Sequence, residues 1–212
     1  MKAKICGMNT LEELNIALGA GCDAIGFLVG ITHLAEDKVS VPKARELIRS
    51  IPPFVTRVAV THLQTAPDII PMLEELAVDT VQLHNDILLE EIRKIRETLP
   101  YLKIVKSVSV TGTEAIAYAE RFVGEVDGII LDSRTTDRLG GTGLTHDWSI
   151  SRRIVEELPL PVILAGGLTP DNLEAAINAV HPYAVDVNSG VETDQKKDPE
   201  KVRKFIEIAH QY

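Results

Sequence analysis

The sequence predicts an α/β fold, a (β/α)8 or TIM barrel in which residues 1–212 form a single domain. Three observations favour this fold. Short apolar runs rich in valine and isoleucine alternate eight times with amphipathic helical segments. The runs are continuously apolar, which is typical of parallel strands covered on both faces. The length of 212 residues is near the lower end for this fold, whereas an open doubly wound sheet usually has about five to seven strands.

The predicted strands are these apolar runs, each followed by polar residues or glycine. They cover residues 2–6, 23–29, 55–62, 79–84, 102–107, 127–132, 161–165 and 184–188. Each strand is followed by a segment in which apolar residues recur with helical spacing. The predicted helices cover residues 11–20, 41–51, 66–77, 88–99, 113–123, 149–158, 170–180 and 199–210.

Capping residues mark where several of these helices begin. Thr10 stands three residues before a glutamate, which predicts a capping box at the first helix. Asp198 is the predicted N-cap of the last helix. Thr169 is the predicted N-cap of the seventh helix, with Pro170 at its first position. Residues 194–197 are interpreted as a loop.

Composition and charge narrow the class of protein. The net charge is −9 and no run is rich in lysine and arginine, so the sequence does not indicate a nucleic-acid partner. No stretch approaches the length of a membrane-spanning helix, and the apolar patch in MKAKICGMNT is too short for a signal peptide. The two cysteines lack Cys-x-x-Cys spacing. We therefore expect a cytoplasmic protein with no nucleic-acid or membrane partner.

Glycine-containing segments follow the last two predicted strands. Gly166 and Gly167 follow the seventh strand, and Ser189 and Gly190 follow the eighth. In (β/α)8 barrels these two loops frequently bind phosphate through backbone N–H groups and a helix N-terminus. Glycine lets an anion approach the backbone closely. The sequence therefore predicts a phosphate site here, and a pair of tight turns is the alternative.

Two candidates for acid–base chemistry stand where strands end. Cys6 ends the first strand, and a thiolate at the catalytic rim can take a proton. Asp132 ends the sixth strand after an apolar run, where a carboxyl group shielded from water can act as a general acid. The structural alternatives are a buried cysteine that acts as a small hydrophobic residue and an aspartate that caps the next loop. Cys22, at the opposite rim, is interpreted as structural.

Three histidines, His33, His62 and His84, lie at or just past the ends of neighbouring strands 2, 3 and 4. With the nearby Glu36 and Asp37 they could hold zinc or another divalent ion. The alternative is that these histidines only form hydrogen bonds, and we expect no metal or other cofactor. The other histidines, 146, 181 and 210, are interpreted as loop or surface residues.

Several motifs occur in one order over nearly the whole chain. They are KICGM, VQLH, LDS, GGTG followed by HDW, LAGGLTPDN, DVNSGVE and KKD. In this set and order they resemble the phosphoribosylanthranilate isomerase family of tryptophan biosynthesis. The resemblance implies a cofactor-free Amadori rearrangement, in which N-(5-phosphoribosyl)anthranilate becomes a 1-amino-1-deoxyribulose 5-phosphate.

The resemblance also implies roles for residues of this chain. Cys6 of the KICG motif would be the general base, and Asp132 of the LDS motif would be the general acid. Asp186 would face the site, and Gln82 and His84 would lie in the substrate pocket. The small-molecule substrate would bind through its phosphate to Gly141, Gly143, Gly166, Gly167, Ser189 and Gly190.

The segment after the second strand departs from the family pattern. The family usually has a Ser-Pro-Arg element there, whose arginine contacts the anthranilate carboxylate, whereas residues 30–40 read GITHLAEDKVS. Lys38 is the nearest cation and could supply a point charge, although Glu36 and Asp37 would repel a carboxylate. A related isomerase or a metal-dependent epimerase on another phosphorylated sugar is therefore an alternative. A non-catalytic phosphate-binding module is another, which the retention of Cys6 and Asp132 argues against.

Overall fold

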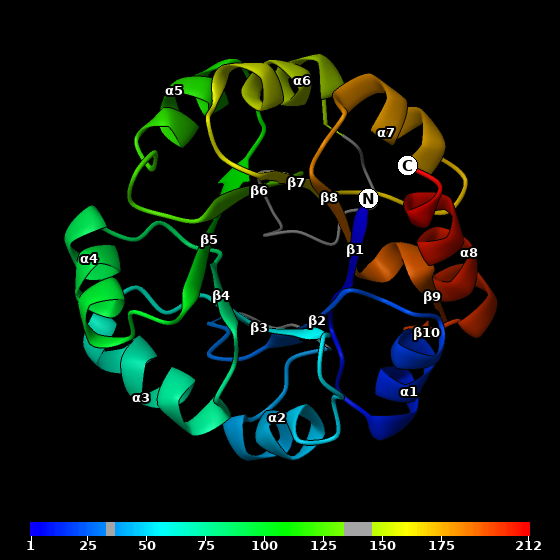
Figure 1. Cartoon of the computed structure of the whole chain (residues 1–212), viewed down its shortest axis with the longest axis horizontal. Helices are drawn as coiled ribbons and strands as arrows, with labels where there is room; N and C mark the ends of the chain where they lie inside the picture. Colours follow the sequence, from blue (N-terminus) through cyan, green and yellow to red (C-terminus); the bar gives the residue numbers. More distant parts are fainter. Residues whose placement is uncertain (33–36, 134–145) are drawn as a thin grey trace.

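The computed structural model describes residues 1–32, 37–133 and 146–212, and its central feature is a closed barrel of parallel strands. Figure 1 shows the barrel viewed along its axis, with helices surrounding it. β1 pairs with both β2 and β8, which closes the sheet. The barrel strands are β1 (Lys2–Ile5), β2 (Ala24–Leu28), β3 (Thr56–Thr61), β4 (Thr80–Leu83), β5 (Lys103–Ser109), β6 (Gly128–Asp132), β7 (Val162–Leu164) and β8 (Ala184–Val187). The predicted (β/α)8 barrel is confirmed.

A helix follows each barrel strand, as the sequence predicts. The helices are α1 (Leu11–Gly19), α2 (Val41–Ile48), α3 (Ala66–Leu76), α4 (Leu89–Thr98), α5 (Glu114–Glu120), α6 (Trp148–Glu157), α7 (Leu173–Val180) and α8 (Pro199–His210). The two termini lie close together, and the amino group of Met1 donates to the carbonyl of Ala209 at 2.9 Å. No helix in the described ranges combines the length and hydrophobicity needed to cross a membrane.

Two of the predicted helix caps are confirmed in atomic detail. Thr10 Oγ1 accepts from the N–H of Glu13 at 3.2 Å, which stabilises the start of α1. The reciprocal half of the predicted capping box differs, because the Glu13 carboxylate accepts from the N–H of Asn9 at 3.2 Å and not from that of Thr10. Asp198 accepts from the N–H groups of Glu200 and Lys201 at 3.0 and 3.1 Å, so α8 also begins where the sequence predicts.

The start of α7 corrects a prediction. The helix begins at Leu173, after a turn, and Thr169 is not its N-cap. The side chain of Asn172 explains the difference, since it accepts from the N–H of Thr169 at 2.8 Å and donates to the carbonyl of Gly167 at 2.9 Å. These bonds stabilise a turn that places Pro170 outside the helix.

The segment 194–197 also differs from the prediction of a loop. After a 3-10 turn, η1 (Ser189–Val191), the chain forms an antiparallel hairpin of β9 (Glu192–Thr193) and β10 (Lys196–Lys197). Asp194 and Gln195, between the two strands, both have positive φ (51° and 61°), as two-residue hairpin turns require. Strands this short leave no periodicity for sequence analysis to detect.

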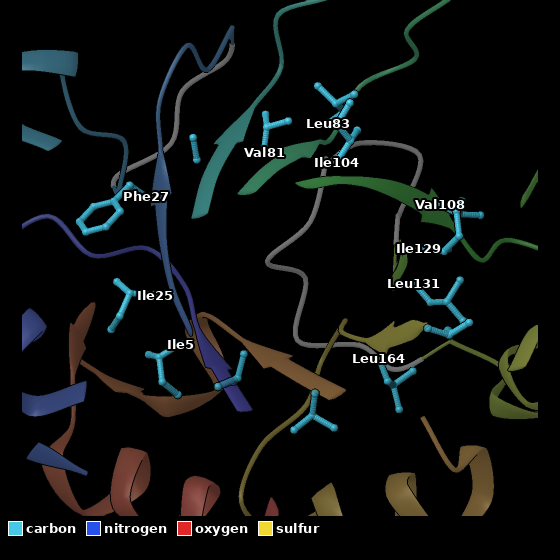
Figure 2. Packing of buried hydrophobic residues seen from close by; sticks show 14 of the residues in the cluster. Ile5, Ile25, Phe27, Val81, Leu83, Ile104, Val108, Ile129, Leu131 and Leu164 are labelled. Carbon is cyan, nitrogen blue, oxygen red and sulfur yellow. The ribbon is translucent and has the colours of Figure 1, made fainter. Parts of the chain in front are cut away.

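The hydrophobic core lies between the barrel and its ring of helices. Figure 2 shows Ile5, Phe27, Leu83 and Leu131 among the strand side chains that pack there. A smaller cluster, made of Cys6, Val58 and Val60, is separate from this core. Because strand side chains alternate between the two faces of a sheet, residues next to the core positions point into the barrel. Those inward residues form the candidate site.

Candidate active site

A buried ion pair joins the neighbouring strands β1 and β8. Lys4 and Asp186 are register partners, and Lys4 Nζ lies 3.0 Å from Asp186 Oδ1. Lys4 Nζ also donates to Gln82 Oε1 at 2.9 Å, and Gln82 Nε2 donates to Ser107 Oγ at 3.2 Å. All four side chains are buried. They form a polar network beneath the barrel mouth, which includes Asp186 and Gln82 of the predicted site residues.

The two charges of this ion pair shift each other's pKa. Burial raises the pKa of Asp186, and the nearby Lys4 ammonium opposes that shift. Burial also acts to lower the pKa of Lys4, but the negative charges of Asp186 and of the Cys6 thiolate outweigh it and the pKa of Lys4 is raised. Lys4 is therefore a permanent cation below the barrel mouth.

Cys6 lies directly above Lys4 at the end of β1. Its side chain is buried, and burial raises the pKa of its thiol to about 11, although the charges of Lys4 and Lys197 act against the shift. Gly26 on β2 leaves the space for the sulfur, because a Cβ atom there would be 2.6 Å from Cys6 Sγ. Burial outweighs the two cations, so the thiol form of Cys6 is favoured in the free protein.

Asp132 is the last residue of β6, where the sequence predicts it. Its Oδ1 accepts from the N–H of Ser133 at 2.8 Å, and its Oδ2 lies 3.3 Å from His84 Nε2. The His84 ring stacks at 4.9 Å from the ring of the buried His62. Asp132 is therefore held at both carboxylate oxygens and faces the mouth between β4 and β6.

Asp186 lies close enough to Cys6 and to Asp132 for charge–charge interactions between them. The charge of Asp132 contributes to the raised pKa of Asp186, and the charge of Asp186 contributes to the raised pKa of Cys6. The barrel therefore brings Cys6 and Asp132 to one rim, on either side of Asp186.

The glycines of the loops after β7 and β8 meet two different structural needs. Gly166 and Gly167 have positive φ (83° and 67°), which L side chains rarely adopt. A Cβ atom at Gly190 would be 1.8 Å from the carbonyl oxygen of Leu168, so the two loops touch. Within the described ranges, the N–H groups of Gly166, Gly167, Ser189 and Gly190 donate to no backbone carbonyl. These donors could bind an anion.

A second buried lysine supports the loop after β8. Lys197 Nζ, on the β10 strand, donates to Asn188 Oδ1 at 2.6 Å and pairs with Glu192. Asn188 in turn donates to Asp37 Oδ2 at 2.5 Å. Asp37, which the sequence suggested would repel a substrate carboxylate, thus has its charge engaged by a side chain of the site.

Sequence analysis missed several members of this site. Lys4 and Lys197 stand in the KICGM and KKD motifs, but no role was assigned to either, because a lysine within a strand or loop is normally exposed. His146, interpreted as a loop or surface residue, is largely enclosed and lies 3.0 Å from Ser133 Oγ. The GGTG-x-x-x-DW spacing places His146 just before α6, which in hindsight was the available signal.

Other predicted site residues lie apart from this cluster or outside the described residues. Lys38 is exposed on the segment after β2, where its backbone bridges to Leu28. Gly141, Gly143 and His33 fall outside the described ranges. Among the residues described, no group of three or more histidine, cysteine, aspartate or glutamate side chains is arranged to hold a metal ion.

A cavity of about 450 Å³ opens beside His84, on the β4–β5 side of the mouth and thus across the barrel from the glycine loops. Ser107, Ser109 and Tyr118 contribute to its lining. The tyrosine hydroxyl donates to Asp86 at 2.8 Å. The cavity shares His84 with the candidate site, whereas much of its remaining lining belongs to α5 and the loop before it.

This arrangement defines a class, the (β/α)8-barrel enzymes that carry their reactive groups at the C-terminal ends of the strands. Residues 3–208 match the family model for N-(5'phosphoribosyl)anthranilate (PRA) isomerase. The N-(5'-phosphoribosyl)anthranilate isomerase 2 of Methanosarcina mazei is 42% identical over 212 residues, which cover 99% of this chain and 94% of that protein. The chain therefore belongs to the N-(5'-phosphoribosyl)anthranilate isomerase family.

Solved structures of this family have the same fold. The phosphoribosyl anthranilate isomerase from Thermotoga maritima aligns over 100% of both chains with a TM-score of 0.88 and 32% identity. A phosphoribosyl anthranilate isomerase in complex with reduced 1-(o-carboxyphenylamino)-1-deoxyribulose 5-phosphate aligns over 100% of both chains with a TM-score of 0.85 and 31% identity.

Proposed function

We propose that this chain converts N-(5-phosphoribosyl)anthranilate to the corresponding 1-amino-1-deoxyribulose 5-phosphate, as a cytoplasmic enzyme of tryptophan biosynthesis that needs no cofactor. The observation that carries the proposal is the placement of Cys6 and Asp132 at one rim, both coupled electrically to Asp186. A site that only bound phosphate would need the glycine loops but neither a thiol nor a carboxyl group opposite it.

Asp132 acts first, as the general acid. Its protonated carboxyl group gives a proton to the furanose ring oxygen, the bond from C1 to that oxygen breaks, and the nitrogen lone pair forms a Schiff base at C1. His84 and the Ser133 N–H hold the carboxyl group from two sides, which fixes its direction toward the ring. General acid–base transfer of this kind contributes about 10²- to 10⁴-fold to a rate.

Cys6 acts second, as the general base. Its thiolate removes the proton from C2, the electron pair of that bond forms a C1=C2 double bond, and the π pair of the C1=N bond returns to the nitrogen and neutralises it. The resulting enolamine tautomerises to the ketone. Because the reaction leaves Cys6 protonated and Asp132 ionised, both exchange protons with solvent before the next turnover. Lys4 stabilises the thiolate by its charge, as its effect on the pKa of Cys6 indicates.

The phosphate of the substrate binds the loops after β7 and β8. The N–H groups of Gly166, Gly167, Ser189 and Gly190 supply donors, and Gly141 and Gly143 belong to the same proposed set. Lys197 holds Asn188 at the start of the loop after β8 by donating to its backbone carbonyl and to its Oδ1 atom. Backbone donors with a nearby cation suit a phosphate dianion.

Lys38 is the proposed cation for the anthranilate carboxylate. It is fixed next to the end of β2 by the bridge to Leu28, and Asp37 is engaged by Asn188. An ammonium group provides a point charge without the two-pronged geometry of a guanidinium. Replacing Lys38 with alanine should therefore raise KM and leave kcat nearly unchanged, and an unaltered KM would dismiss this role.

The test is turnover of freshly made phosphoribosylanthranilate, followed by its fluorescence, with and without a chelator. We expect wild-type turnover to survive the chelator. Asp132→Asn should reduce kcat by roughly 10²- to 10⁴-fold and keep its affinity for ribose 5-phosphate. Cys22→Ser, which changes the cysteine at the opposite rim, is the matched control and should keep wild-type turnover.

Three results would contradict the proposal. Absence of turnover by folded wild-type protein would mean that the substrate is another phosphorylated sugar. Loss of turnover on chelation would indicate a metal-dependent reaction. Full activity of the Asp132→Asn protein would remove Asp132 from the mechanism.

A further inference from the structure

A hydrogen-bonded bridge links the end of β6 to the start of α6 through His146. The Nδ1 atom of His146 lies 3.0 Å from Ser133 Oγ, and its Nε2 atom lies 2.6 Å from Ser151 Oγ. Ser133 directly follows Asp132, and Ser151 is a fully buried residue of α6. A hydroxyl group in such a position can move only if the helix moves, so Ser151 is a fixed anchor for the imidazole.

Ser133 contacts two parts of the candidate site at once. Its N–H group donates to Asp132 Oδ1 at 2.8 Å. The backbone of Gly166 packs against its other side, since a Cβ atom at Gly166 would be 2.4 Å from both the nitrogen and the Oγ of Ser133. The placement of Ser133 therefore determines where the carboxyl group of Asp132 and the first glycine of the β7 loop lie.

We propose that His146 is a positioning residue, which holds Ser133 and thereby fixes Asp132 relative to the β7 loop. The inference rests on the proposed function, because it assigns Asp132 the role of general acid. His146 itself does not touch Asp132 in any hydrogen bond between the described residues, so it acts through Ser133.

The chemistry of the bridge suits a fixed support. Burial lowers the pKa of His146, which keeps its imidazole neutral near pH 7 although Asp132 and Asp147 act against the shift. A neutral imidazole donates through one nitrogen and accepts through the other, and a serine hydroxyl can do either. Both hydrogen bonds can therefore form while the imidazole is uncharged. They give each buried serine hydroxyl a partner, and an unpaired hydroxyl there would be costly.

Three substitutions of His146 separate its two contacts. His146→Phe removes both hydrogen bonds but keeps a ring of similar shape. His146→Asn places an amide near the position of Nδ1 and can still reach Ser133, whereas His146→Gln places one near Nε2 and can still reach Ser151. The steady-state kcat and KM for phosphoribosylanthranilate are measured for each folded variant and for wild type.

We expect His146→Phe to lower kcat by roughly 10- to 100-fold, the size of effect that a small misplacement of a catalytic group produces. KM should change much less than kcat. His146→Asn should recover most of the loss and His146→Gln should not, because only the bond to Ser133 supports Asp132. A merely structural role would give Asn and Gln similar kinetics.

The outcomes are distinguishable from failure of the proposed function. No turnover by wild-type protein would overturn the proposed function and this inference with it. Wild-type turnover with an unchanged kcat in His146→Phe would overturn the inference alone. Equal kinetics of the Asn and Gln variants, or better kinetics of Gln, would also overturn it, and this comparison decides the matter if His146→Phe fails to fold.

Discussion

The Nε2 atom of His84 lies 3.3 Å from Oδ2 of Asp132, so a β4 side chain contacts the carboxyl group that ends β6. His84 Nδ1 is buried and has no hydrogen-bond partner among the described residues. The imidazole is therefore oriented by its contact with Asp132 and by the stacked ring of His62. His84 limits the directions in which Asp132 can point.

Replacing His84 tests this contact. His84→Leu removes the group beside Oδ2, and we expect kcat to fall about tenfold because the carboxyl group gains freedom before proton transfer. Steady-state kinetics with phosphoribosylanthranilate measure the effect. His62→Leu is the control, since it removes the stacked ring but not the contact, and it should cost less. A larger loss in His62→Leu than in His84→Leu would contradict the argument.

The thiol of Cys6 gives a prediction that needs no substrate. Its pKa is raised to about 11 by burial, and the charge of Lys4 holds it from rising further. In protein that carries Cys22→Ser, the ultraviolet absorbance of the thiolate should appear with a midpoint of about 11. The same titration of Cys6→Ser protein supplies the baseline.

Adding Lys4→Met to the Cys22→Ser protein should move the midpoint of the Cys6 titration upward. The thiolate then loses the charge of Lys4, so the neutral thiol is favoured. The kcat of Lys4→Met should fall in the same direction, by roughly tenfold for each unit of upward shift if the thiolate is the base. A midpoint that stays in place or moves down would show that Lys4 does not stabilise the thiolate.

The barrel and its rim were predictable because they depend on local signals. Runs of valine and isoleucine identify the strands, and the ends of those strands place Cys6 and Asp132 at the same rim of the barrel. The start of α7 was not predictable from capping rules, since Asn172 bonds backward to Thr169 and Gly167. Two local signals competed there, and the structure contains the turn that Asn172 stabilises.

The contacts that tune the site depend on register, which the sequence does not specify. Lys4 and Asp186 are 182 positions apart, and they face each other only because β1 and β8 close the barrel with these residues paired. His146 and Ser133 are 13 positions apart, and helical or strand periodicity does not relate them. Contacts of this kind can be identified only from the three-dimensional arrangement of the strands and loops.

Replacing Gly166 tests the proposed phosphate loop. A comparison with Gly124 separates the cost of backbone strain from an effect on the site. The positive φ of 83° at Gly166 is shared by Gly124, where an added Cβ would have no other atom within 4 Å. Alanine at either position should lower the free energy of unfolding by about 1–2 kcal/mol through backbone strain alone. Urea denaturation measures this shared cost.

Gly166→Ala should have a further effect that Gly124→Ala lacks. Its Cβ would meet Ser133 at 2.4 Å and Asp132 Oδ1 at 3.0 Å, so the loop must shift away from the proposed acid. We expect KM to rise and kcat to fall in Gly166→Ala, and both to stay near wild type in Gly124→Ala. Equal kinetics of the two variants would mean that the β7 loop does not bind the substrate.

The partly buried imidazole of His146 predicts a pH dependence of stability. Its pKa lies below the ordinary value of 6.5 in the folded protein, mainly because of burial, with Asp132 and Asp147 acting in the opposite direction. As the pH falls through 6.5, the unfolded chain therefore binds a proton that the folded chain does not, and the folded state loses stability. The loss ends once the pH is below the lowered pKa, and its slope is at most about 1.4 kcal/mol per pH unit.

Urea denaturation at several values between pH 8 and pH 5, about the usual range over which histidine titrates, should show this loss in wild type. His146→Asn cannot titrate, so the difference in unfolding free energy between wild type and this variant should shrink as the pH falls. The other ionisable groups are common to both proteins and largely cancel in the difference. A difference that grows on acidification would mean that His146 gains a proton on folding, and the neutral bridge between Ser133 and Ser151 would then be wrong.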